Sequence, residues 1–517
     1  RKLLLFLFIA CVRLPAQLIQ PQDLTYLGAF RLPGPSGGSN WEWSGMAMTF
    51  YPPGDPLGPH DGFSGSLFAS GHDHHQMVSE ISIPEPVLSP QKDTAELNTA
   101  QTLQPFTDIK SGFHGHLELP VMGLAWLEAQ SGQSADKLHF CWGQHIQYNE
   151  LTHGWCGTDL SNPESAGPWR LGEVNNYTSN DILFDIPVSW ADRHVNGRRL
   201  ASARFREGVW SGLGPSLYAV APWKDGNPPG QGDTLQSITA LLLYGENDPL
   251  LPEIVTDSTR GMIGYKLADQ WSGGVWLTAE NKSAAVFTGT KAMGESWYGF
   301  SDGTVWPYEG PYPAVPDPPH NQRGFWADSI HAQMIFYDPD DLAAVAAGSA
   351  ETWDPQPYAV YDFTHLLFDP GYDYWRAKAH SVGAAAFDRE HGLLYVMERL
   401  ADGDKSLVHV WRVGSDTGVP DWSSKESDSG PRLSRSMPNP CSNHTLFSIW
   451  LPEPGRVRVV IYDISGRKTA TLLDEEKPAG EHDLCWDAST AAAGVYAAVL
   501  CAGRRTVSRK VCVVRKP

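Results

Sequence analysis

The chain has 517 residues and a formal net charge of -20, with 39 Lys and Arg against 59 Asp and Glu. Nucleic-acid binding depends on Lys and Arg that neutralise phosphates, so this balance argues against a nucleic-acid partner. The 50 glycines, 40 prolines and 20 tryptophans, with only 19% charged residues, predict an all-β fold of short strands joined by turns.

The N-terminus has the pattern of an export signal. Arg1 and Lys2 precede an apolar run at residues 3–10, and small residues follow it. This order is typical of a secretory signal peptide, which we predict over residues 1–17; a buried N-terminal strand is the alternative. The run is too short to span a bilayer, and no other stretch predicts a transmembrane segment. Cys11 lies in a weak lipoprotein-like box, which leaves lipidation open.

Residues 20–413 carry a loose repeat that predicts a β-propeller. Each copy has a first strand led by glycine and then two or three further strands, with a period of about 70 residues. The leading glycines are Gly45, Gly123, Gly208, Gly273 and Gly383. A strand at residues 26–32 supplies the fourth strand of the last copy, which closes the ring and removes open edges. We therefore predict five blades, with six blades or a large irregular β-sandwich as alternatives.

In a propeller, the loops before first strands and the loops after second strands share one face. Glycoside hydrolysis needs two carboxyl groups. The carboxylates expected on this face are Glu42, Asp73, Glu118, Glu207 and Glu398. The side chains expected to bind a sugar are Trp43, Trp210, Trp223, Trp271, Lys291, His380 and Arg399. The ordinary alternative is that the acids are solvated strand ends and that most tryptophans fill the core.

A histidine-rich turn adds a second kind of candidate site. Imidazole and carboxylate groups are good ligands for a divalent metal, which is the one cofactor that the residues suggest. The candidate ligands are His72, Asp73, His74, His116 and His145. A solvated turn without a metal is the alternative.

The cysteine distribution predicts disulfides. After removal of the predicted signal peptide, Cys141 and Cys156 belong to the large domain, and four cysteines belong to the C-terminal region. Even counts in an exported chain favour disulfides, including a Cys141–Cys156 bridge. The pairing of the other four stays open.

The C-terminal region forms a separate module. Residues 414–435 are polar and rich in Ser, Gly and Asp, which predicts a linker. Residues 436–517 contain six or seven short strands divided by turn signals, which predict a β-sandwich. The segments at residues 461–467, 486–487 and 494–496 (IYDISGR, WD and GVY) carry a specific resemblance. The module resembles FlgD-type immunoglobulin-like domains and type A sorting domains of the type IX secretion system.

This resemblance implies export across the outer membrane or attachment to the cell surface, with the secretion machinery as a partner. An accessory sandwich without a sorting role is the alternative. We therefore predict a secreted or surface-attached protein that binds or processes an extracellular glycan. A surface-displayed propeller for adhesion and a metal-dependent extracellular hydrolase are the two competing hypotheses. The residues fit both a binding protein and a glycoside hydrolase-like enzyme.

Overall fold

The chain divides into two compact units, Arg1–Gly414 and Ser415–Pro517. The computed structural model describes residues 17–55, 63–114, 121–144, 150–204, 208–248, 251, 254–369, 381–414, 431–433, 441, 444–463, 467–502 and 505–515. Residues 1–16 of the predicted signal peptide, most of the predicted linker, and Glu118, Glu207, His116, His145 and His380 lie outside the described residues. The predicted domain boundaries stay predictions.

The described residues of the N-terminal unit form five sheets, numbered in chain order. Sheet 1 consists of β3 (Met48–Tyr51), β4 (Ser66–Ser70), β5 (Val78–Ile81) and β6 (Thr102–Thr107). Sheet 2 consists of β7 (Val121–Leu127), β8 (Lys137–Gly143), β9 (His153–Cys156), β10 (Ala166–Leu171) and β14 (Thr234–Leu235). Sheet 3 consists of β11 (Ile182–Asp185), β12 (Leu200–Ala203), β13 (Leu217–Val220) and β15 (Ile238–Leu242).

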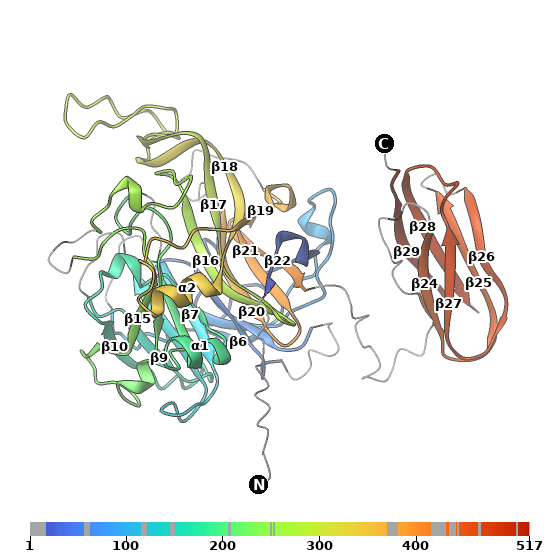
Figure 1. The fold of residues 1–517 in the computed structure, drawn as a ribbon, viewed down its shortest axis with the longest axis horizontal. Coiled ribbons are helices and arrows are strands. Elements are labelled where there is room, and N and C mark those ends of the chain that lie inside the picture. Colours follow the sequence, from blue (N-terminus) through green and yellow to red (C-terminus); the bar gives the residue numbers. More distant parts are fainter. Residues whose placement is uncertain are drawn as a thin grey trace, which may run out of the picture. The chain divides into compact units, whose positions relative to one another are not determined.

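Sheet 4 consists of β16 (Gln270–Ala279), β17 (Lys282–Gly299), β18 (Gly324–Tyr337) and β19 (Ala359–Asp362), with the short β1 (Gln17–Leu18) beside β17. Sheet 5 consists of β20 (Val382–Asp388), β21 (Leu393–Asp402), β22 (Lys405–Val413) and β2 (Leu24–Arg31). Two short helices, α1 (Val188–His194) and α2 (Pro339–Ala346), lie on the surface of the sheets (Figure 1).

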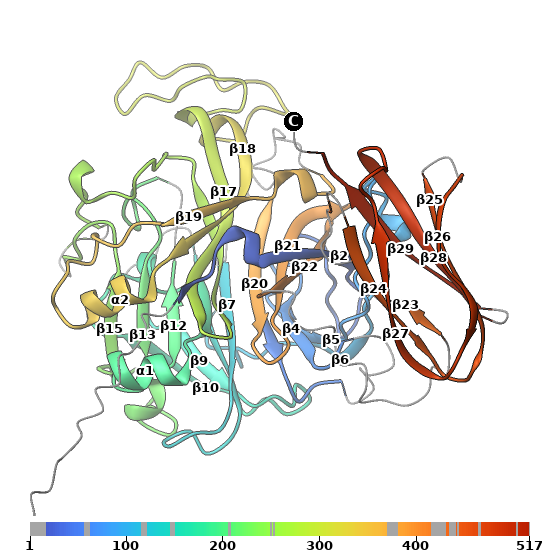
Figure 2. The same ribbon diagram turned by 45° about the vertical axis from the view of Figure 1, so that its right-hand side comes forward.

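The first strands of the five sheets form a closed ring. β3 contacts β7, β7 contacts β11, β11 contacts β16, β16 contacts β20, and β20 contacts β3. Figure 2 shows the sheets from a second direction. The predicted all-β fold class is confirmed. The N-terminal strand closes sheet 5 as predicted, because β2 pairs with β22 antiparallel from Leu24 opposite Val413 to Arg31 opposite Leu407.

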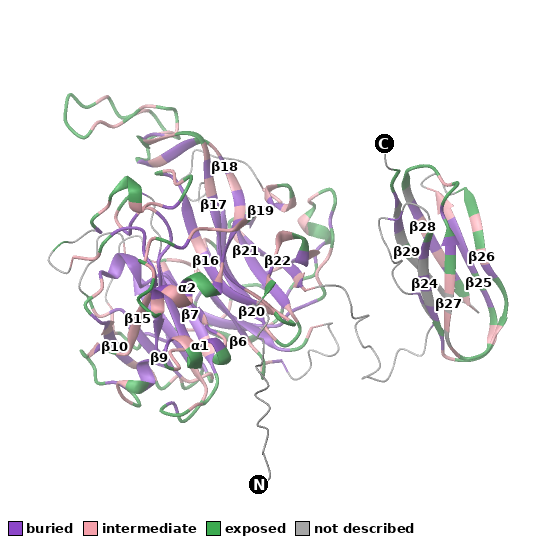
Figure 3. Cartoon of the chain, in the orientation of Figure 1, coloured by how far each residue is buried: buried purple, intermediate pink, exposed green. Residues whose placement is uncertain are grey.

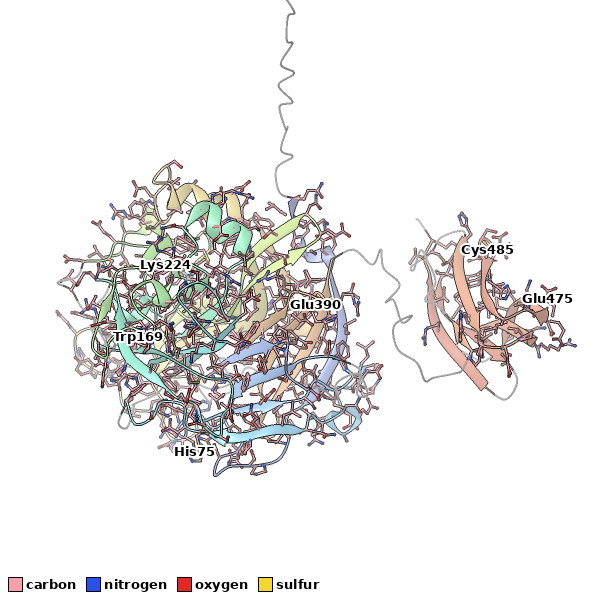
Figure 4. All side chains as sticks on the ribbon, turned by 90° about the horizontal axis from the view of Figure 1, so that it is seen from below. His75, Trp169, Lys224, Glu390, Glu475 and Cys485 are labelled. Atoms are coloured by element: carbon pink, nitrogen blue, oxygen red, sulfur yellow. The ribbon has the colours of Figure 1, made fainter. Side chains whose placement is uncertain are left out.

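Five of the hydrophobic clusters among the described residues lie between neighbouring sheets. The cluster between sheets 3 and 4, for example, joins Phe184 and Leu217 to Trp276 and Phe287. Both faces of these sheets are therefore buried, which Figure 3 shows as purple strands. Trp169 lies inside the unit, as Figure 4 shows, and is fully buried. Burial of such side chains on both sides of each sheet stabilises the ring.

The third sheet corrects the predicted repeat. Its first strand is β11, and not the segment at Gly208, where the described residues form turns. With the first strand placed at Gly208, the strand that follows it would be the second of the sheet, whereas β13 is the third. The pattern of leading glycines does not identify this first strand, because Asn180 and Asp181, and not a glycine, directly precede β11.

The predicted Cys141–Cys156 bridge is wrong, since both thiols are free and buried. Cys141 on β8 lies opposite His153, and Cys156 on β9 lies opposite Leu138. Side chains alternate between the two faces of a strand, so residues 153 and 156 face opposite sides. The two cysteines therefore belong to different hydrophobic clusters. Cys485 is also free.

The C-terminal unit is a two-sheet β-sandwich. One sheet consists of β23 (Arg432–Leu433), β24 (His444–Leu451) and β27 (Gly480–Asp487). The other consists of β26 (Lys468–Lys477), β25 (Gly455–Asp463), β28 (Gly494–Ala502) and β29 (Arg505–Val513). Phe447 and Ile449 from the first sheet share a core with Val459, Ile461 and Leu500 from the second. In the part of the chain that the structure describes, no helix is long and apolar enough to cross a membrane.

Candidate functional site

Four charged side chains from three sheets meet over the ring, and we call them the axial cluster: Asp73, Asp181, Arg204 and Arg399. Asp73 follows β4, Asp181 precedes β11, Arg204 follows β12, and Arg399 lies in β21. Sheets 3 and 5 are not neighbours in the ring, yet Asp181 and Arg399 interact electrostatically. The cluster therefore lies towards the centre of the ring. The exposed fractions of Asp181, Arg204 and Arg399 are 5%, 3% and 7%.

Arg399 is held by the close approach of two glycines. A Cβ atom on Gly45 would lie 2.7 Å from Arg399 Cγ, and one on Gly383 would lie 3.2 Å from the same atom. Gly45 also has a φ of +105°, which side chains rarely adopt. Arg399 Nε donates a hydrogen bond to the Ser44 carbonyl oxygen at 3.2 Å, and its backbone N–H donates to Ser381. These contacts fix the position of the guanidinium group, and its two Nη groups form its outer end.

Arg204 joins the cluster to aromatic side chains. Its Nη1 donates to Asn180 Oδ1 at 3.0 Å, and its Nη2 donates to the Gln144 carbonyl oxygen at 3.1 Å. The guanidinium carbon lies 5.2 Å from the centre of the Tyr177 ring, within the range of a cation–π contact. Trp210 lies 5.4 Å from Tyr177 and is partly exposed. Of the predicted sugar-binding tryptophans, Trp210 thus lies next to the axial cluster.

Asp181 and Arg399 both have unused hydrogen-bonding capacity. No described residue donates a hydrogen bond to the Asp181 carboxyl group, and none accepts one from the Arg399 Nη groups. Among the described side chains, no ion pair within 4.0 Å joins Arg399 to Asp181 or to Asp73. Neither the Asp181 oxygens nor the Arg399 Nη atoms are among the fully buried polar atoms that lack a partner in the described part of the chain. These atoms are therefore still accessible at the surface of a mostly buried site.

Burial also changes the acidity of both groups. Burial raises the pKa of Asp181 to about 7, although Arg204 and Arg399 act in the opposite direction. Burial lowers the pKa of Arg399, against the opposing effect of Asp73 and Asp181. A carboxyl group with a pKa near 7 in a polar site is a candidate functional group.

The histidine-rich turn lies beside the cluster. Glu42 and Asp73 both act on His72, whose pKa is lowered mainly by burial. His72 Nδ1 is 3.2 Å from Asp73 Oδ1, and the rings of His72 and His75 stack at 4.5 Å. Figure 4 labels His75 at the surface. The structure therefore brings the predicted Glu42, His72, Asp73 and His74 together.

No group of three or more potential ligands that could hold a metal occurs among the described residues. His116 and His145 lie outside those residues, and the metal site stays a prediction. A small pocket next to the turn is lined by Met46, Ser70, Gly71, His72, Asp73, Gln76, Val121 and Met122.

Three other predicted residues are held by buried contacts. Glu398 is 1% exposed, and it accepts hydrogen bonds from His409 Nε2 at 2.7 Å and from the backbone N–H groups of Phe368 and Asp369. Lys291 pairs with the buried Asp269 at 2.7 Å. Trp271 is fully buried in the cluster between sheets 3 and 4.

Trp223 follows the third strand of sheet 3 and not the second, so it lies at the opposite end of the strands from the axial cluster. It is 5% exposed and packs 5.8 Å from the ring of His139. Trp43 is partly exposed, and its backbone N–H donates to Asp404. Asp181 is not among the residues predicted from the sequence. With the third repeat divided correctly, the polar pair Asn180–Asp181 directly before an apolar strand would have identified it.

The fold and site thus define an all-β protein with a ring of five sheets and a buried polar cluster over the ring. No family model and no curated protein matches the chain. Among solved structures, it is similar to PorZ, an essential bacterial surface component of the type IX secretion system of Porphyromonas gingivalis. The identity is 13% over 93% of this chain and 53% of PorZ, with a TM-score of 0.28. The chain spans about half the length of PorZ.

A second similarity is to dimeric latent PorU from Porphyromonas gingivalis, at 19% identity over 24% of this chain and 12% of that one, with a TM-score of 0.14. A third is to a tetra-tandem repeat in the extending region of a large adhesion protein. There the identity is 10% over 93% and 94% of the two chains, with a TM-score of 0.14. These scores are too low to define a fold, so the site is interpreted from its own residues.

Proposed function

We propose that the chain is a secreted or surface-attached protein whose ring of five sheets is a five-bladed β-propeller that binds an extracellular glycan over the axial cluster. The proposal is carried by the polar ends of two mostly buried side chains, the Asp181 carboxyl group and the Arg399 Nη groups, which have no hydrogen bond to the described residues. A ligand that reaches both would satisfy hydrogen bonds that the described residues leave unmade, which favours binding.

Sugar hydroxyl groups suit this pair. A hydroxyl group both donates and accepts, so it can donate to the Asp181 carboxylate while it accepts from an Arg399 Nη group. Trp210, beside Tyr177 and Arg204, offers a partly exposed ring on which a sugar can stack. The cluster therefore provides both the polar and the aromatic contacts that a glycan needs.

The C-terminal unit supports the proposed location. Its resemblance to type IX sorting domains implies export, and its two-sheet sandwich agrees with an immunoglobulin-like module. We therefore propose the secretion machinery as a partner of this unit and an extracellular polysaccharide as the ligand of the N-terminal unit.

The test is a glycan array with the full chain, followed by calorimetric titration of the glycans that bind. Arg399→Gln and Asp181→Asn each remove one charged hydrogen-bonding group, and we expect affinity to fall by about 10-fold or more. Arg193→Gln, on the exposed surface of α1, is the matched control and should bind as the parent does. Near-ultraviolet circular dichroism checks that each variant is folded. An array without any bound glycan, or folded site variants that bind normally, would refute the proposal.

Glycan hydrolysis is a second candidate function, and the pKa of Asp181 of about 7 favours it. Glycosidases keep one carboxyl group protonated near neutral pH as the general acid, while a second carboxylate stays ionised. Asp181 and Asp73 are the described carboxyl groups of the cluster. Release of reducing ends from a bound glycan, abolished in Asp181→Asn, is the expected result. A glycan that binds but releases no reducing ends would leave binding as the function.

A further inference from the structure

We infer that the glycan is acidic, and that Arg399 binds the carboxylate of a uronic acid residue while Asp181 hydrogen-bonds a hydroxyl group of the same sugar. This inference rests on the proposed function and names the class of ligand.

The geometry of Arg399 suits a carboxylate. Its Nε is used by the Ser44 carbonyl oxygen, and its stem is fixed between Gly45 and Gly383. The two Nη groups therefore remain as a fixed, planar pair of donors. Such a pair matches the two oxygens of a carboxylate, with two parallel hydrogen bonds.

Arg399 also lacks a direct ion pair. It is 7% exposed, and no described carboxylate lies within 4.0 Å of it. Asp73 and Asp181 act on its charge only from a greater distance. An ion pair at contact distance stabilises a mostly buried guanidinium group further, so a ligand carboxylate at the Nη groups is favoured.

A sugar hydroxyl group suits the Asp181 carboxyl group, which has no hydrogen bond to the described residues. A single hydroxyl group both donates and accepts, so it can pair with the ionised or the protonated carboxyl group. A uronic acid carries a carboxylate and hydroxyl groups on one rigid ring, which lets it reach Arg399 and Asp181 together at a small cost in conformational entropy.

The experiment uses the full chain and three uronate oligosaccharides, derived from pectin, alginate and hyaluronan, each beside its carboxyl-reduced counterpart. We expect at least one uronate to bind about 10-fold or more tightly than its reduced form. Arg399→Gln should abolish this preference. Arg399→Lys should weaken it strongly, because Lys keeps the charge but loses the planar pair of donors. Arg193→Gln should keep it.

The alternative outcomes separate this inference from the proposed function. Equal binding of acidic and reduced forms would overturn the inference and leave glycan binding intact. Binding of poly-L-glutamate as tightly as the best uronate would overturn it in favour of an acidic peptide. An absence of binding to any glycan, acidic or neutral, on the array would refute the proposed function and the inference together.

Discussion

Asp181→Asn should stabilise the N-terminal unit at alkaline pH. The native pKa of about 7 lies roughly 3 units above the ordinary value of 3.8. Above pH 7 the Asp181 carboxyl group is therefore ionised in the folded state. The ionised form is less stable in the folded state than in the unfolded chain. At 1.36 kcal/mol per pKa unit, this penalty is about 4 kcal/mol. Asn is neutral at every pH and has nearly the same shape, so it removes the penalty.

The sign of the pH dependence follows from proton binding. Between about pH 4 and pH 7 the folded state keeps the proton of Asp181 and the unfolded state loses it, so rising pH destabilises the parent protein. The stability difference between Asp181→Asn and the parent should therefore be largest at pH 8 and vanish near pH 4. Urea unfolding at pH 8, 6 and 4, followed by tryptophan fluorescence, measures this difference. A difference that does not change with pH would refute the assignment of a neutral, buried Asp181.

Other substitutions test the neighbouring contacts. Glu398→Gln should lower stability by about 2–4 kcal/mol. One of the two acceptor oxygens of Glu398 is replaced by an NH₂ donor, which then faces His409 or the backbone N–H groups. An unchanged urea midpoint would contradict a structural role for the Glu398 carboxylate. Gly45→Ala should destabilise the unit by about 1–3 kcal/mol and weaken glycan binding. The reasons are that the new Cβ would collide with the Arg399 side chain and that the φ of Gly45 is positive. Normal glycan binding by this variant would show that the position of the Arg399 stem does not affect binding. Reducing agent should leave the urea midpoint unchanged because Cys141 and Cys156 are free, whereas a lower midpoint would reveal a bridge.

The sequence predicted the fold class and ring closure because both depend on local signals. Apolar runs separated by Gly and Pro mark the strands, and the N-terminal strand is suited to pair with the open edge of the last sheet. The signal failed at β11, a strand of four residues without a leading glycine. Because β11 is not identified, β13 is taken as the second strand of sheet 3 instead of the third. Trp223, which follows β13, is therefore expected at the end of the strands opposite to the one where it lies.

Individual site residues were harder to predict because their roles depend on contacts between distant segments. Glu398 and Arg399 are neighbours in sequence and looked equivalent as polar residues at a strand end. Glu398 meets His409 and two backbone N–H groups, so all of its contacts serve the structure. Arg399 points to the other side of the strand, where Gly45 and Gly383 leave room for its stem.

A comparison with Asp269 shows that missing hydrogen bonds, rather than burial or residue type, distinguish the axial cluster. Asp269 is fully buried like Asp181, but Lys291 and two backbone N–H groups satisfy its carboxylate. Asp181 has two arginines near enough to act on its charge and no described hydrogen-bond donor. A fold that maximised its own stability would have paired these groups, as it did for Asp269. These unmade hydrogen bonds are the reason for proposing a ligand at this position, and the Asp181→Asn variant measures what the buried acid costs in stability.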